Sequence, residues 1–278
     1  MAIRTVEDLE LSGKRVIVRC DFNVPLTERL EITDENRIVQ SLPTIRYILD
    51  HQAKLILMSH LGRPKGKPVA EMSLAPVAKS LSRHLNREVK LAPDCIGTEV
   101  ENMVNAMKPG DVVLLENLRF HAEEEKNDPE FSKALAALAD VYINDAFGTA
   151  HRAHSSTEGI TRYLKTVGCG YLLKKEIDYL HDAVSNPKRP FVAIIGGAKI
   201  SGKIEVIETL LDKADTLLIG GAMTYTFYKA MGLEVGKSKV EDDKIGLAAE
   251  IMKKADASKC EFLLPVDCMV STAFDKDA

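Results

Sequence analysis

Short, continuous apolar runs rich in Val, Ile and Leu recur along the first half of the chain. Polar and apolar positions do not alternate within them, which is typical of strands buried on both faces of a parallel sheet. Segments with apolar residues at helical spacing lie between the runs, such as residues 73–85 and 128–139. This alternation of strands and helices predicts a doubly wound α/β fold. The predicted strands are residues 15–20, 54–59, 111–117 and 140–145.

A second series of apolar runs begins near residue 191, and a helical pattern at residues 171–184 separates it from the first series. The breaker-rich residues 185–190 follow that helix. We interpret the helix as a bridge between two doubly wound parallel-sheet (Rossmann-like) domains. The expected boundaries are 1–170 for the first domain, 171–190 for the linker helix and hinge, and 191–278 for the second domain.

The second predicted domain has fewer strands than the first. Its predicted strands are residues 190–197, 216–223 and 260–267, with a helix at residues 202–214. A doubly wound domain usually has about five or six strands. We therefore expect the second domain to be incomplete at its C-terminus.

The composition excludes several classes of protein. Apolar residues make up 45% and charged residues 28%, as in a soluble globular protein, and the net charge of −4 argues against a nucleic-acid coat or a polybasic membrane anchor. The five cysteines show no spacing typical of a metal site, and no apolar run is long enough for a secretory signal or a membrane helix. We expect a cytoplasmic protein whose anionic ligands are held by a local basic cluster.

Arg and His residues follow successive predicted strands. In an open α/β sheet, ligands bind beyond the carboxyl ends of the strands. Any one of these residues alone could be a surface cation or a turn former, but their repeated placement at the same end favours a site for a multiply charged anion, because Arg binds phosphate and carboxylate by two parallel hydrogen bonds. The polar Asp21 and Asn23 would contact hydroxyl groups of this ligand. The strand-end residues are Asp21, Phe22, Asn23, His60, Leu61, Gly62, Arg63, Arg119, His121, His151, Arg152 and His154.

The glycine-rich stretch GGAKISGKI at residues 196–204 follows the first strand of the second series. It lacks the hydroxyl residue of a P-loop, because Ile204 stands where Ser or Thr should follow Gly-Lys, and its glycine spacing does not fit a dinucleotide-binding fingerprint. Three interpretations remain: a P-loop without its metal ligand, a structural turn, or a different phosphate site. We favour the third, in which Lys199 and Lys203 approach a polyphosphate over a helix N-terminus. One anion site on each of two domains is typical of a transferase whose domains close around its substrates.

Five motifs together resemble the phosphoglycerate kinase family, and they occur in order along the chain. The resemblance implies a two-domain enzyme with a hinged cleft. It would transfer a phosphoryl group reversibly between 1,3-bisphosphoglycerate and ADP, giving 3-phosphoglycerate and ATP in glycolysis. The motifs are VRCDFNVP (18–25), SHLGRP (59–64), LLENLRF (114–120), NDAFGTAHRAHSS (144–156) and GGAKISGKI (196–204).

The resemblance also implies roles for particular residues. Arg37 and Lys199 would stabilise the transferring phosphoryl group, and no enzyme nucleophile is needed. One departure from the family pattern is Ala222, where the family commonly has a third glycine. The implied phosphoglycerate site contains Asp21, Phe22, Asn23, Arg37, His60, Leu61, Gly62, Arg63, Arg119 and Arg152. The implied nucleotide site contains Gly196, Gly197, Lys199, Lys203, Gly220 and Gly221.

Members of this family are considerably longer than 278 residues. Mg²⁺ would arrive with ADP or ATP, and we expect its protein ligand outside this sequence, so no metal-ligating residue is assigned here. The alternative to a kinase is a fragment that binds 3-phosphoglycerate without catalysis. The resemblance implies a monomer, with no nucleic-acid or membrane partner.

Overall fold

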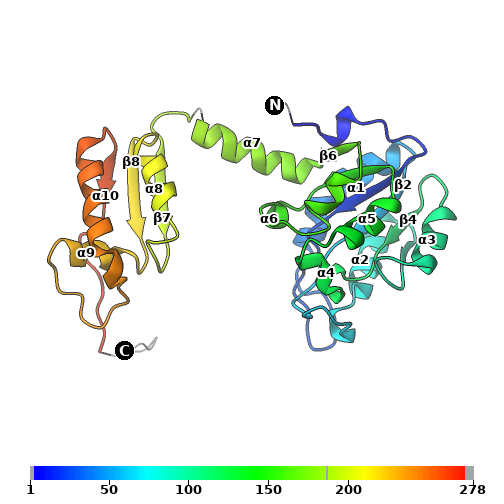
Figure 1. The fold of residues 1–278 in the computed structure, drawn as a ribbon, viewed down its shortest axis with the longest axis horizontal. Coiled ribbons are helices and arrows are strands. Elements are labelled where there is room, and N and C mark those ends of the chain that lie inside the picture. The colour runs from blue at the N-terminus through cyan, green and yellow to red at the C-terminus, as the bar shows by residue number, and fades with distance from the viewer. Residues whose placement is uncertain (1–2, 186, 273–278) are drawn as a thin grey trace. The chain divides into compact units, whose positions relative to one another are not determined.

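The computed structural model describes residues 3–185 and 187–272 (Figure 1). The chain divides into two compact units, Met1–Tyr179 and Leu180–Ala278. Helix α7 (Tyr171–Ser185) begins in the first unit and ends in the second. None of the described helices is long and apolar enough to cross a membrane.

The first unit contains a six-stranded parallel sheet with the strand order β3-β4-β2-β1-β5-β6. The chain builds the β2 side of β1 first and then crosses to β5 on the other side, which creates a topological switch point beside β1. Because all the strands are parallel, their carboxyl ends lie at the same edge of the sheet. The strands are β1 (Arg15–Arg19), β2 (Lys54–Met58), β3 (Val89–Leu91), β4 (Val112–Leu114), β5 (Val141–Asn144) and β6 (Val167–Cys169).

Helices cover both faces of this sheet, which confirms the doubly wound fold expected for the first half of the chain. Val16 and Val18 of β1 belong to one buried core with residues of α1 (Asn36–Asp50) and α2 (Ala75–Leu85). Ile17, which points to the opposite face, belongs to a second core with residues of α3 (Thr98–Asn105) and α5 (Pro129–Ala137). The other elements are η1 (Val6–Asp8), η2 (Ala70–Met72), η3 (Leu118–Phe120), α4 (Ala122–Glu125), α6 (Phe147–Ala150) and η4 (Gly159–Arg162).

The hydrophobic pattern did not predict strands β3 and β6 or helix α1 of the first unit. Strands β3 and β6 have only three residues each, which is too short for an apolar run to be recognised. Helix α1 contains Pro43 in its interior, and such a proline normally marks the end of a helix because it cannot donate a backbone hydrogen bond. In α1 the packing of Ile38, Ile45 and Ile48 into the core outweighs this cost.

The second unit contains a three-stranded parallel sheet with the strand order β7-β8-β9. Ala193 and Ile195 of β7 pack in a core with residues of α8, α9 and α10, whereas the alternate residues Val192 and Ile194 are 50% and 76% exposed. One face of β7 is therefore packed and its other face is open among the described residues. The elements are β7 (Val192–Gly196), α8 (Ile204–Leu211), β8 (Thr216–Gly220), α9 (Thr224–Ala230), η5 (Asp242–Lys244), α10 (Ile245–Ala257) and β9 (Glu261–Leu263).

Asp145, which follows β5, holds the first turn of α7. Its Oδ1 accepts hydrogen bonds from the backbone N–H groups of Leu172 at 2.9 Å and Leu173 at 3.1 Å. The N–H of Tyr171 donates to Thr44 Oγ1 at 2.9 Å. Asp145 is fully buried, and burial raises the pKa of its carboxyl group. The start of α7 is thus fixed to the first unit by two side chains, Asp145 and Thr44.

Replacing Asp145 with alanine should lower the free energy of unfolding by about 1–2 kcal/mol, because two N–H groups at the start of α7 lose their acceptor. Asp145→Asn should lose less, since its side-chain oxygen can still accept both bonds. Urea denaturation of the full chain measures the difference. Asp178→Ala removes an exposed carboxylate on the same helix and serves as the control. Equal stability of the two alanine variants would contradict a capping role for Asp145.

Candidate functional site

The residues after β1, β2 and β4 contact one another at the carboxyl edge of the first sheet. Arg37 in the first turn of α1 donates from Nη1 to Asp21 Oδ2 at 2.6 Å. The N–H of Gly62 donates to Asn23 Oδ1 at 2.8 Å, and Arg119 Nη1 donates to the Gly62 carbonyl oxygen at 3.0 Å. These hydrogen bonds connect the loops after β1, β2 and β4, which are far apart in the sequence.

His60 lies buried at the centre of this group. Arg19 Nη2 lies 3.0 Å from His60 Nδ1, and a guanidinium group can only donate, so Nδ1 accepts and the ring proton sits on Nε2. Burial and the positive charge of neighbouring arginines lower the pKa of His60 to about 2. The imidazole is therefore neutral at physiological pH. The arginines whose charge acts on it are Arg19, Arg37, Arg119 and Arg152.

These four arginines and His60 form what we call the arginine basin. Burial lowers the pKa of Arg119, as do the charges of Arg152 and Arg19, while its ion pair with Glu125 at 3.2 Å acts in the opposite direction. Mutual repulsion among like charges is unfavourable unless an anion or a buried carboxylate offsets it. Asp21 and Glu125 pair with Arg37 and Arg119 and offset part of this charge, and the positive charge that remains favours an anionic ligand.

Arg19 was missed by the sequence analysis and is a central component of the basin. Its side chain is 1% exposed, Nε donates to Ser156 Oγ at 2.9 Å, and Nη1 donates to the carbonyl oxygen of Cys20. Ser156 in turn contacts Glu124, which is also 1% exposed, through its Oγ and through its N–H at 2.9 Å. The available signal was the unusual arginine inside the apolar run at residues 15–20.

Some predicted residues lie at the site without presenting a polar side chain to it. Phe22 and Leu61 are buried, and their backbone N–H groups donate to Ser59 Oγ at 2.8 Å and to Asn117 Oδ1 at 3.2 Å. These two residues position the backbone of the strand-end loops.

Four cationic or imidazole side chains predicted at strand ends behave differently. Arg63 is exposed and makes no hydrogen bond or ion pair within the described ranges, so no contact joins it to the arginine basin. His151 lies 3.4 Å from Arg152 Nε. His121 instead pairs with Asp94, at 2.6 Å. His154, the fourth such residue, lies 3.9 Å from Glu124 Oε1.

The low pKa of His60 predicts a specific pH dependence of stability. An unfolded histidine takes up a proton near pH 6.5, and the folded protein cannot do so until about pH 2, so stability is complete above pH 6.5 and falls as the pH decreases. The limiting slope for one proton is about 1.4 kcal/mol per pH unit. Denaturation of the wild type and of His60→Gln from pH 7.5 to 4.5 should show a steeper loss for the wild type. Parallel curves would contradict a neutral His60.

The second unit brings two pairs of glycines together at the ends of β7 and β8. Gly196 lies opposite Gly220 in the strand register. Gly221 has φ +72°, and a Cβ atom built on it would lie 2.8 Å from the backbone N and O of Gly197. Only glycine allows this conformation at such a close approach.

The loop at residues 197–203 does not resemble a P-loop in its hydrogen bonding. The Glu241 carboxylate accepts from the N–H groups of Ile200 at 2.5 Å and Ser201 at 3.2 Å, so donors that a P-loop would aim at phosphate face an acidic group of the same chain. Lys203 occupies the N-cap position of α8, and Ile204 begins that helix. The side chains of Lys199 and Lys203 are exposed and make no hydrogen bond or ion pair within residues 187–272. Both cations are thus available to an anionic ligand.

The residues around these glycines do not fit a dedicated Mg²⁺ site. Mg²⁺ requires a set of hard oxygen ligands in near-octahedral geometry. The loop offers two lysines and glycine backbone, and the carboxylate of Glu241 is already engaged by Ile200 and Ser201. We therefore assign no step to a metal ion held by the described residues.

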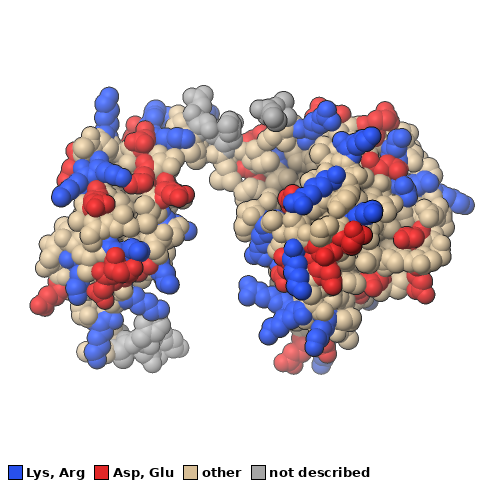
Figure 2. Space-filling view, in the orientation of Figure 1, with Lys and Arg blue, Asp and Glu red and all other residues tan. Residues whose placement is uncertain are grey.

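The distribution of surface charge on the drawn face does not indicate a further anion site. On the face drawn in Figure 2, basic and acidic side chains are interspersed over both units. A local cluster such as the arginine basin is therefore what distinguishes an anion site in a chain of net charge −4.

The fold and the site define a two-unit α/β protein with a cluster of arginines around His60 at the carboxyl edge of its first sheet. A family model described as phosphoglycerate kinase matches residues 6–278. The chain is 59% identical to a phosphoglycerate kinase of Chloroherpeton thalassium and 56% identical to one of Chlorobaculum tepidum, covering all of this chain and 70% of each relative. The chain therefore belongs to the phosphoglycerate kinase family, a family of enzymes.

Solved structures agree with this assignment. The structure of phosphoglycerate kinase from Coxiella burnetii matches with a TM-score of 0.85 and 41% identity, over 95% of this chain and 66% of that one. Phosphoglycerate kinase from Pyrococcus horikoshii matches with a TM-score of 0.77 and 31% identity, over 94% of this chain and 67% of that one. The chain thus spans about two thirds of the length of these structures.

Proposed function

We propose that the protein transfers a phosphoryl group between 1,3-bisphosphoglycerate and ADP, giving 3-phosphoglycerate and ATP, and that the reaction is reversible. The observation that carries this proposal is the cluster at the switch point of the first sheet, where Arg19 contacts His60 and the charges of Arg37, Arg119 and Arg152 also act on its ring. Several guanidinium groups around one point suit a small ligand with more than one negative charge. Membership of the phosphoglycerate kinase family identifies which ligand of this class to test.

In the proposed complex the first unit binds the phosphoglycerate. Arg119 and Arg152 would neutralise its negative charges, and the Nε2–H of His60 would donate a hydrogen bond to a ligand oxygen. Asn23 and Asp21 supply oxygens that can accept from its hydroxyl group. Arg63, whose side chain is exposed and makes no hydrogen bond or ion pair in the described structure, would contact the ligand only on binding.

In the proposed nucleotide site, Lys203 binds phosphate oxygens of ADP and the glycine pairs allow the backbone to approach the ligand. A terminal oxygen of ADP attacks the phosphorus of the acyl phosphate. The bond from this phosphorus to the acyl oxygen breaks, and the leaving group is the carboxylate of 3-phosphoglycerate. Arg37 and Lys199 stabilise the charge on the transferring group, and the protein supplies alignment rather than a nucleophile.

Arg37 and Lys199 belong to different units, so the proposed transfer requires both units to contact one pair of substrates. We include in the proposal that helix α7 is the hinge, and that the protein acts as a cytoplasmic monomer. Light scattering of the purified chain tests the oligomeric state.

A second candidate function is binding of 3-phosphoglycerate without catalysis. The observation that favours it is the open, apolar face of β7 at Val192 and Ile194, since an incompletely covered sheet is a poor support for a nucleotide site. The first unit, in contrast, is packed on both faces.

Two measurements on the full chain separate these functions. Calorimetric titration with 3-phosphoglycerate reports binding, and a coupled assay of ATP formation from 1,3-bisphosphoglycerate and ADP reports transfer. Binding together with transfer supports the kinase, and binding without transfer supports the second candidate. If Arg119→Ala leaves both measurements unchanged, the arginine basin is not the substrate site.

A further inference from the structure

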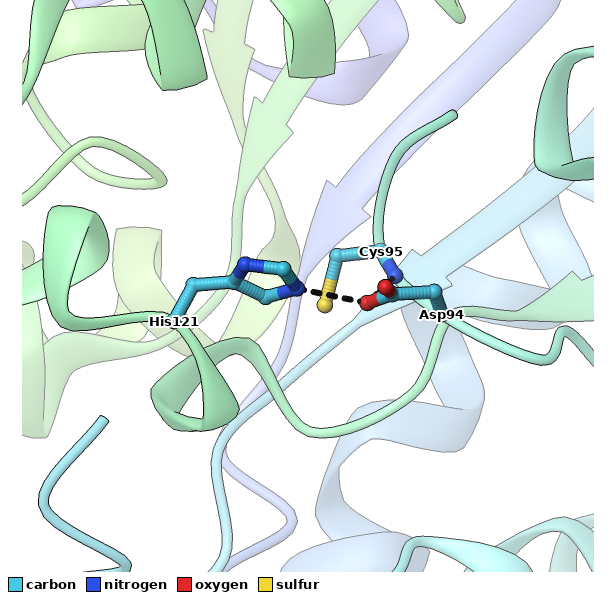
Figure 3. A group of neighbouring side chains, drawn as sticks. All are labelled: Asp94, Cys95 and His121. Carbon is cyan, nitrogen blue, oxygen red and sulfur yellow. Dashed lines mark hydrogen bonds and ion pairs between the residues drawn. The ribbon is translucent and has the colours of Figure 1, made fainter. Parts of the chain in front are cut away.

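Three potential metal ligands lie together outside both candidate sites. Asp94 and Cys95 belong to the segment between β3 and α3, and His121 follows η3. One ligand atom from each residue lies within 4.8 Å of the other two. Figure 3 shows the carboxylate of Asp94 and the sulfur of Cys95 both next to the imidazole ring of His121. None of these three residues is used in the proposed phosphoryl transfer.

The contacts within this group are close. His121 Nε2 lies 2.6 Å from Asp94 Oδ1, and Cys95 Sγ lies 2.9 Å from the carbonyl oxygen of Glu116. Cys95 is fully buried, whereas the side chains of His121 and Asp94 are 26% and 47% exposed. The sulfur therefore lies on the buried side of the group, and the other two ligands are accessible to solvent. An ion could reach the group from the side of Asp94 and His121.

The combination of ligands indicates which cation would bind. Thiolate sulfur, imidazole nitrogen and carboxylate oxygen together are the ligand set of Zn²⁺, whereas Mg²⁺ and Ca²⁺ prefer oxygen ligands alone. Around a tetrahedral zinc ion, nitrogen and oxygen ligands lie roughly 3.3 Å apart, given metal–ligand distances of about 2.0–2.1 Å. The 2.6 Å pair of Asp94 and His121 would therefore have to open by less than about 1 Å. Rotation of the Asp94 side chain, which is 47% exposed, would do this and would break the hydrogen bond that Oδ1 accepts from the Cys95 N–H.

We propose that Asp94, Cys95 and His121 bind a thiophilic divalent cation of the Zn²⁺ type, with water as the fourth ligand. On binding, the Cys95 thiol loses its proton to solvent and its hydrogen bond to Glu116, and the sulfur forms a bond to the metal. Nε2 of His121 donates its lone pair to the metal, so the ring proton moves to Nδ1. Three protein ligands and one open position make the ion exchangeable.

Cobalt(II) is a spectroscopic probe for this site, because a thiolate ligand gives an intense ligand-to-metal charge-transfer band in the near ultraviolet. The exposed Cys268 should first be replaced by serine, so that this surface thiol does not bind the probe. Titration of the full chain with Co²⁺ should then produce the charge-transfer band and the visible bands of tetrahedral cobalt. Addition of Zn²⁺ should abolish both.

In the same background, Cys95→Ser should lose the charge-transfer band, and His121→Gln should weaken cobalt binding by at least the roughly 10–100-fold that loss of an outer-shell partner causes. Cys260→Ser removes a buried cysteine of the second unit and should leave the spectrum unchanged. Circular dichroism confirms that each variant is folded. Absence of the band in the parent protein, or its persistence in Cys95→Ser, would overturn the proposal. Neither result depends on phosphoryl transfer.

Discussion

Replacing Arg37 with alanine should lower kcat about 10²–10³-fold, equivalent to about 2.7–4 kcal/mol, the effect of removing one preorganised donor from a transition state. In the proposed mechanism Arg37 stabilises charge on the transferring phosphoryl group. Arg37 lies in the first unit, whereas the proposed ADP site lies in the second unit. The dissociation constant of ADP should therefore change little. A coupled assay and calorimetric titration with ADP measure the two quantities.

The structure separates this catalytic effect from a loss of folding. Arg37 pairs with Asp21, but the arginine side chain is 48% exposed, and pairs of this kind contribute only about 0–1 kcal/mol to stability. Arg46→Ala is a matched control on the same helix, because the Arg46 side chain is exposed and, among the described residues, donates to the His84 carbonyl oxygen alone. Unchanged kcat in the Arg37 variant would remove Arg37 from the catalytic group.

Replacing Arg19 with methionine should lower the free energy of unfolding by about 3–5 kcal/mol. The variant would leave the buried carboxylate of Glu124 without the cation that reaches it through Ser156. It would also remove the donor to His60 Nδ1. Urea denaturation of the full chain measures this loss.

Two further variants identify the cause. Arg15→Met removes an arginine from the same strand, but its pair with Asp140 is partly exposed and should contribute only about 0–1 kcal/mol. Adding Glu124→Gln to Arg19→Met should recover part of the stability, because the unpaired buried charge is then absent. Loss of less than about 1 kcal/mol in Arg19→Met would show that Glu124 does not depend on Arg19. If Arg19→Met does not fold, Arg19→Lys, which keeps the charge, allows the same comparison.

Much of the fold was predictable because buried parallel strands require continuous apolar runs. The runs at residues 15–20 and 54–59 became β1 and β2, and residues 171–184 became α7, within one residue at either end. Strands β3 and β6 were not predictable, since each is held by its neighbours and has too few residues for a pattern of its own.

The site was predictable in part. Asp21, Asn23, His60 and Arg119 follow strands, so the geometry of a parallel sheet places them at one edge. Arg37 begins a helix rather than following a strand, and only the family pattern indicated it. Arg19 lies inside a strand, where the hydrophobic pattern treats a charged residue as an interruption rather than as a part of a site.

The amino-acid sequence by itself determined the class of fold, the edge of the sheet at which a ligand would bind, and the family, because local periodicity and motif order do not depend on distant contacts. Only the tertiary structure decided that Arg19, Ser156 and Glu124 form a buried network beneath His60, and that Asp94 and Cys95 meet His121. These residues are separated by 26 to 137 positions along the chain, from Cys95 to His121 and from Arg19 to Ser156. The packing of the helices and loops against the sheet brings them together, and no periodicity along the chain records that packing.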